Sequence, residues 1–147
     1  MARSGNENIT SYRVLENEAR KEFMATAPLT MAVTDGLLVK IVNFNEIDKA
    51  ETEIPLYVAD PSKGSQKYII GSEVYIDKTD FSEEVRNDFF GLMPDKVSRF
   101  YYGPCIKVTD IVKTATGNID HIKVALVAND KKAKIIHWVS KESAVPC

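Results

Sequence analysis

Short apolar runs separated by turn sequences fill this chain from about residue 30 onward. Nine runs are rich in residues that favour β-strands, and turn pairs such as Asp35-Gly36 and Gly117-Asn118 separate them. Runs this short and this closely spaced predict a barrel or a sandwich rather than alternating strand–helix units. The predicted strands are Thr30–Thr34, Leu38–Phe44, Glu53–Val58, Lys67–Ile70, Glu73–Ile76, Val97–Tyr102, Cys105–Val112, Ile119–Ala128 and Ala133–Val139.

The segment before these runs carries helical periodicity. Apolar side chains at Tyr12, Leu15, Ala19 and Phe23 recur every three or four residues and line one face. Pro28 ends the pattern, because the residue before a proline is disfavoured in the α conformation. We therefore expect a connecting helix within residues 11–28.

Two further segments complete the expected organisation. A short internal helix is expected within Asp80–Leu92, where Asp80 or Ser82 can cap the first turn. Residues 1–10 are small and polar, and we expect them to form a disordered tail. This leaves residues 29–147 for the β region.

Composition places the chain among ordinary folded proteins. Of its 147 residues, 44% are apolar and 27% are charged, which excludes a wholly disordered chain. No stretch approaches the roughly 18 uninterrupted apolar residues of a membrane span, and the first residues lack the apolar core of a signal peptide. Two cysteines, Cys105 and Cys147, are too few for a disulfide framework. We expect a cytoplasmic protein with no membrane partner.

The charge is unevenly distributed along the chain. The net charge at pH 7 is −2, which argues against a strongly basic nucleic-acid binder. Residues 1–60 hold six basic and ten acidic groups, a net charge of −4, whereas residues 96–147 hold nine basic and four acidic groups, a net charge of +5. The last third can therefore build a basic face.

Two stretches in this basic third suit contact with RNA. Arg99-Phe100-Tyr101-Tyr102 interleaves a cation with rings that can stack on unpaired bases. Strand alternation would instead turn Phe100 and Tyr102 into the core. Lys131-Lys132-x-Lys134 follows an Asn-Asp turn, where it can neutralise phosphates or form a solvated hairpin tip.

Catalytic and metal sites find little support in the sequence. His121 and His137 lie inside predicted strands, outside any recognisable signature with a serine or cysteine nucleophile. The histidines and cysteines lack the paired short spacings of a zinc site, and the common glycine-rich phosphate loops are missing. We expect no catalytic residue, no metal and no cofactor in this chain.

Several segments, taken in order, carry a resemblance that covers the chain from about residue 13 to its end. They are Ala27-Pro28, Met31-Ala32-Val33, Leu38–Phe44, Gly64-Ser65, Glu73–Phe81, Phe89-Phe90, Ile106-Lys107, Gly117-Asn118-Ile119 and Ile136–Ser140. Together they resemble the anticodon-binding region of glutaminyl-tRNA synthetases, in the class I glutaminyl and glutamyl family. Ile76–Phe81 and Ile136–Ser140 are the most specific pieces.

The resemblance implies a mainly β fold in which residues 29–147 form an anticodon-binding β-barrel region, one complete barrel plus part of a second. It implies tRNA as a partner, and the catalytic domain of a tRNA synthetase in cis or in trans. Neither an HIGH-like nor a KMSKS-like sequence occurs, so no aminoacylation is expected from this chain alone. On this hypothesis the cations that contact the RNA backbone are Lys67, Lys78, Arg99 and Lys107, and the rings that stack on bases are Phe90 and Tyr101.

The chain departs from the family pattern where polar side chains face the bases. Family arginines fall on Leu29, Gly91 and Tyr101, and a family asparagine and arginine fall on Ala59 and Gln66. Base discrimination requires hydrogen-bonding groups, so we expect weak, salt-sensitive tRNA binding with little anticodon selectivity. Introducing arginine at positions 29 and 91 is expected to restore some selectivity.

Two other functions stay open on the sequence alone. A chain that keeps the family's structural residues but lacks its arginines also fits a degenerate relative, one that serves as a structural or protein-interaction module. A 5S rRNA-binding ribosomal protein has a similar barrel, which leaves rRNA binding open by fold analogy.

For stability, we expect Trp138 to be buried. We expect Thr30–Phe44 to form a weakly protected edge, because the family's closing strands follow residue 147.

Overall fold

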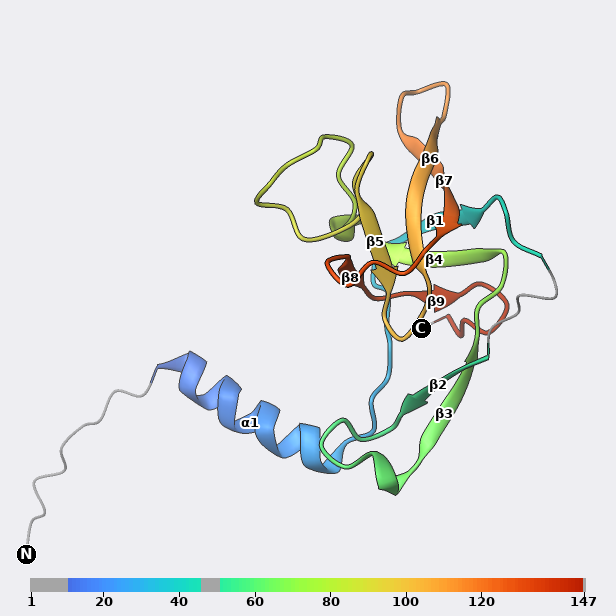
Figure 1. Ribbon diagram of the computed structural model, residues 1–147. Helices are drawn as coiled ribbons and strands as arrows, with labels where there is room; N and C mark the ends of the chain where they lie inside the picture. The colour runs from blue at the N-terminus through green and yellow to red at the C-terminus, as the bar shows by residue number, and fades with distance from the viewer. Residues whose placement is uncertain (1–10, 46–50, 147) are drawn as a thin grey trace, which may run out of the picture. The chain divides into compact units, whose positions relative to one another are not determined.

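The computed structural model describes residues 11–45 and 51–146, so the predicted tail at residues 1–10 lies outside the described residues. Figure 1 shows one helix, α1 (Tyr12–Thr26), followed by strands. The strands are β1 (Gly36–Ile41), β2 (Glu51–Pro55), β3 (Ser65–Ile69), β4 (Glu73–Asp77), β5 (Val97–Phe100), β6 (Cys105–Lys113), β7 (Ile119–Val127), β8 (Lys134–Ile136) and β9 (Val139–Ser140). The fold is mainly β, as predicted.

The chain divides into two compact units. The helical unit contains α1, residues 27–30 and residues 55–65; the sheet unit contains residues 31–45, 51–54 and 66–146. In the helical unit, the Ser11 side chain accepts a hydrogen bond from the backbone N–H of Arg13 and caps α1. The backbone N–H of Leu29 then donates to the carbonyl of Leu56 at 2.6 Å. The predicted helix is confirmed, although none of its residues is buried.

The sheet unit contains a seven-stranded, strongly curled sheet with the strand order β8-β5-β6-β7-β1-β4-β9 (Figure 1). β6 and β7 form its long antiparallel hairpin, with Cys105 opposite Val127. β1 runs parallel to β7 and antiparallel to β4, so it lies inside the sheet. The expectation of an edge at Thr30–Phe44 is therefore wrong: β8 and β9 form the edges, and Thr30–Thr34 is not a strand.

The core lies on one face of this sheet and follows strict strand alternation. Buried and part-exposed residues alternate along β1, β4 and β5, as period-two patterning requires. Trp138 is fully buried, with its ring centroid 5.9 Å from that of Phe100 and 6.4 Å from that of Tyr68. The predicted burial of Trp138 is confirmed.

The short helix predicted within Asp80–Leu92 is wrong. A single 3₁₀ turn, Lys78–Asp80, precedes an irregular loop over residues 81–92. The ends of this loop pair with each other: the N–H of Leu92 donates to the carbonyl of Asp80 at 2.7 Å, and the N–H of Ser82 donates to the carbonyl of Leu92 at 3.0 Å. These bonds close the neck of the loop and occupy the carbonyl that a first helical turn would need.

Candidate nucleic-acid interface

The outer face of β5 and β8 brings together side chains that the sequence singled out separately. On β5, Ser98 and Phe100 are buried, whereas Arg99 and the following Tyr101 are partly exposed on the other face, and Tyr101 also packs against the edge of the core. β8 pairs with β5 in parallel, with Arg99 opposite Ile135, which is 56% exposed. Arg99, Tyr101 and the residues that flank Ile136 therefore share one face of the sheet at its β8 edge.

An aromatic cluster occupies the end of this face. The Tyr101 ring lies 4.7 Å from the Tyr102 ring and 5.1 Å from the His137 ring, measured between centroids. Burial against this cluster raises the pKa of the Tyr101 hydroxyl above its usual value. Behind it, the indole N–H of Trp138 donates to the carbonyl of Tyr101 at 2.9 Å. This hydrogen bond connects the aromatic cluster, at Tyr101, to the buried Trp138.

The alternation that placed Phe100 in the core does not extend to Tyr102. Phe100 is fully buried as predicted, but Tyr102 is 45% exposed. Tyr102 lies in the turn after β5 with a φ of 54°, a left-handed conformation that rotates its side chain out of the strand pattern. This turn therefore leaves the Tyr102 ring exposed beside the ring of Tyr101.

Arg99 keeps its full charge on this face. Its guanidinium donates a hydrogen bond to the side-chain oxygen of Asn129, which is neutral. Across residues 11–45 and 51–146, no carboxylate lies within ion-pairing distance of it. A charge-preserving contact of this kind leaves the guanidinium available to a phosphate.

The three predicted lysines differ from Arg99 because each is paired with a carboxylate. The ammonium of Lys67 lies 3.0 Å from Glu51, that of Lys78 lies 2.6 Å from Asp35, and that of Lys107 lies 3.8 Å from Asp95. The hydrogen bond that Lys67 donates to Glu51 raises the pKa of Lys67. Exposed pairs of this kind add little stability, but each carboxylate offsets the positive charge that a phosphate would meet.

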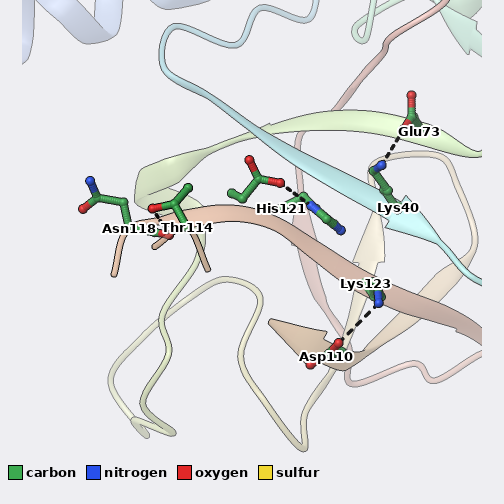
Figure 2. A network of polar contacts seen from close by, with 8 residues as sticks. Lys40, Glu73, Asp110, Thr114, Asn118, His121 and Lys123 are labelled. Atoms are coloured by element: carbon green, nitrogen blue, oxygen red, sulfur yellow. Dashed lines mark hydrogen bonds and ion pairs between the residues drawn. The ribbon is translucent and has the colours of Figure 1, made fainter. Parts of the chain in front are cut away.

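The same pairing recurs in the middle of the sheet. Figure 2 shows Lys40 of β1 bound to Glu73 at 3.2 Å and Lys123 of β7 bound to Asp110 at 3.4 Å. His121 lies on β7 two residues before Lys123, and its Nδ1 is 2.6 Å from the carboxylate of Asp120. The centre of the outer face is therefore a row of compensated charges rather than a basic patch.

Uncompensated positive charge gathers instead around the turn between β7 and β8. Lys131, Lys132 and Lys134 form no ion pair within the described part of the chain. The Lys134 ammonium lies 3.8 Å from the centroid of the Phe90 ring, a cation–π contact, and Phe90 is 73% exposed. Lys134 lies opposite the inward-facing Ser98, whose hydroxyl donates to the carbonyl of Gly91, so Lys134 and Phe90 lie on the other side of this sheet edge from Arg99. We call the Arg99 side the β5–β8 face, defined as Arg99, Tyr101, Lys131, Lys132 and His137.

The structure thus groups some of the predicted RNA-binding residues and separates others. Arg99 and Tyr101 lie on the β5–β8 face, and Lys107 lies on the same side of the neighbouring β6. Phe90 contacts Lys134 on the other side of the β8 edge. Lys67 lies on β3 in the two-stranded sheet, and Lys78 lies beyond β4. His137 and Asn129 were not predicted as site residues; only the parallel pairing of β5 with β8 brings them to Arg99 and Tyr101.

Within the described residues, no group of three or more histidine, cysteine or acidic side chains is placed to hold a metal ion. No helix in that part of the chain is both long and apolar enough to cross a membrane.

Comparison with known proteins gives this face its context. Residues 27–127 match the family described as tRNA synthetases class I (E and Q), anti-codon binding domain. The chain belongs to this family. Among its relatives, the probable glutamine–tRNA ligase of Dictyostelium discoideum is 36% identical over 88% of this chain and 17% of its own length. The glutamine–tRNA ligases of Nitrobacter hamburgensis and Clostridioides difficile are 30% and 33% identical over 90% and 92% of this chain. The chain spans 25% and 26% of those two relatives.

One departure from the pattern of this anticodon-binding family is enforced by the backbone. A Cβ atom at Gly91 would collide with the carbonyl oxygen of Asp80 and lie 2.6 Å from the Phe89 ring. The Asp80 carbonyl cannot withdraw, because it accepts the hydrogen bond from Leu92 that closes the loop. An arginine at position 91 would therefore have to displace the neck of this loop, and its expected effect on selectivity stays a prediction.

Proposed function

We propose that this chain binds tRNA through the β5–β8 face, as the anticodon-binding part of a glutamine–tRNA ligase that positions tRNA for aminoacylation. The observation that carries the proposal is the coincidence of unpaired cations with exposed rings. Arg99 and the lysines of the β7–β8 turn supply charge, the partly exposed Tyr101 ring beside His137 supplies a stacking surface, and Phe90 supplies another across the edge of the sheet. On this proposal the catalytic domain acts in cis or in trans, and this chain supplies no activation chemistry.

The charge arrangement also sets the strength of binding. The β5–β8 face and Lys134 at its edge offer four cations that no carboxylate of the described residues pairs with: Arg99, Lys131, Lys132 and Lys134. With a slope of roughly 0.7–0.9 per neutralised phosphate, raising the salt from about 50 to about 200 mM should weaken binding about 50- to 150-fold. Binding is weak at physiological salt for the isolated chain, and selectivity among anticodons is low because few donors face the bases.

Filter binding of a glutamine tRNA and a tRNA with an unrelated anticodon, at both salt concentrations, tests the proposal. Arg99→Ala should weaken both tRNAs alike, by about tenfold at low salt. Lys67→Ala is the matched control, since it removes the same charge from a lysine that Glu51 already neutralises; it should change the affinity less than about twofold. Equal losses for both variants, or tight binding restricted to the glutamine tRNA, would place the RNA surface elsewhere.

A protein-interaction module is the second candidate, and α1 favours it. Tyr12, Leu15 and Phe23 expose 85%, 64% and 63% of their surfaces on one side of this helix. Exposed apolar faces of this kind mark interaction surfaces. No tRNA binding at about 50 mM salt would favour this function over RNA recognition.

A further inference from the structure

Arg99 is held differently from the other fixed cations of the described chain. Ten lysines and arginines there are fixed by carboxylates within 4 Å. Arg99 is fixed by the amide oxygen of Asn129. A carboxylate would orient the guanidinium and cancel its charge, whereas an amide orients it and leaves the charge intact.

Asn129 is itself anchored from the core side. The thiol of Cys105 lies 3.6 Å from the same Asn129 oxygen, and the backbone N–H of Asp130 donates to the Cys105 sulfur at 3.4 Å. Cys105 is 2% exposed and lies opposite Arg99 in the β5–β6 pairing. The buried Cys105 thiol therefore holds Asn129 and Asp130, the start of the turn after β7, beside Arg99.

We infer that Asn129 is a positioning residue for RNA: it fixes the Arg99 guanidinium for a phosphate of the bound tRNA without neutralising it. This inference rests on the proposed function. A guanidinium recognises a phosphate through a planar fork of donors, so its orientation matters more than that of an ammonium. Fixing the long side chain beforehand reduces the rotamer freedom that binding would otherwise remove. The donors not used by Asn129 remain open to the phosphate.

Two variants of Asn129 separate orientation from charge. Asn129→Asp keeps a partner for Arg99 but neutralises it, so the salt slope should fall by about 0.7–0.9, and affinity at about 50 mM salt should fall about tenfold. Asn129→Ala frees Arg99 without cancelling its charge, so the slope should be kept while affinity falls about two- to fourfold. Asn118→Asp is the matched control, because it adds the same charge at the opposite end of the β6–β7 hairpin, where its side chain contacts Thr116. It should change affinity less than about twofold.

A double-mutant cycle then tests whether Asn129 acts through Arg99. In an Arg99→Ala background, Asn129→Ala should have no further effect on tRNA affinity. Without RNA, the side-chain NMR signals of Arg99 should be resolved in the wild type and averaged in Asn129→Ala. Trp138 emission should be unchanged in every variant if the fold is intact.

The outcomes separate this role from the proposed function. The positioning role is overturned if the wild type binds tRNA and Asn129→Ala binds equally well. It is also overturned if Asn129→Asp matches Asn118→Asp, or if the loss in Asn129→Ala persists without Arg99. If the wild type binds no tRNA at low salt, the proposed function and the positioning role both fall.

Discussion

Replacing Gly91 with alanine should destabilise the sheet unit sharply, because the backbone leaves no space for a Cβ. That atom would strike the Asp80 carbonyl oxygen, lie 2.9 Å from its carbonyl carbon and lie 2.6 Å from the Phe89 ring. Overpacking of this kind costs about 1–3 kcal/mol, and disturbing the bond from Leu92 to Asp80 adds about 1 kcal/mol. The expected loss is therefore about 2–4 kcal/mol, or roughly 5–12 °C in Tm for a chain of this size.

Urea unfolding followed through Trp138 measures this loss, since Trp138 is the single tryptophan and is fully buried. Gly36→Ala is the matched control: its Cβ would meet the Tyr75 ring at 3.2 Å, and a side chain can shift where a carbonyl cannot. The control should lose less than about 1 kcal/mol. If Gly91→Ala unfolds at the same urea concentration as the wild type, Gly91 does not lie against the Asp80 carbonyl in the folded loop.

Three further outcomes are expected. Trp138 should emit at short wavelength in the folded chain and shift to the red on unfolding; an emission maximum typical of exposed indole at neutral pH would contradict its burial. Hydrogen bonds from the Thr79 hydroxyl and backbone, and then from Thr34, hold the pKa of Asp77 well below its ordinary value of 3.8. Its ionised form therefore stabilises the fold above about pH 4, and that contribution is lost as the pH falls further. Asp77→Asn should show a flatter fall in urea midpoint between about pH 5 and pH 3 than the wild type, and parallel curves would rule out this contribution. Finally, this chain alone should give no ATP–pyrophosphate exchange with glutamine or glutamate, and turnover above a heat-killed sample would refute that.

Local pattern predicted most of the strands but not how they are joined. Alternation in β1, β4 and β5 identifies their buried residues because each strand has one face on the core. The position of β1 inside the sheet depends on its parallel pairing with β7, about eighty residues away in sequence, and no local signal encodes that pairing. The loop over residues 81–92 contains residues that favour a helix. Its two ends instead pair with each other, because the N–H of Leu92 donates to Asp80 and the N–H of Ser82 donates to Leu92.

The candidate site was predictable in kind but only partly in membership. Arg99 and Tyr101 were identified because a strand places alternate residues on one face. The lysines Lys67, Lys78 and Lys107 carry the same charge in the sequence, and only the structure shows the carboxylate beside each of them. Whether a lysine is neutralised depends on tertiary neighbours, which a sequence pattern does not contain.

Backbone amide NMR can map, residue by residue, where tRNA contacts this chain. Labelled protein is titrated with a glutamine tRNA at about 50 mM salt, where phosphate contacts are strongest. The account predicts that shifted amides cluster in β5, in β8 and in the turn containing Lys131 and Lys132, while the amides around Lys67 in β3 stay unmoved. Shifts confined to β2 and β3 or to α1, or no shifts at any tRNA concentration, would contradict it.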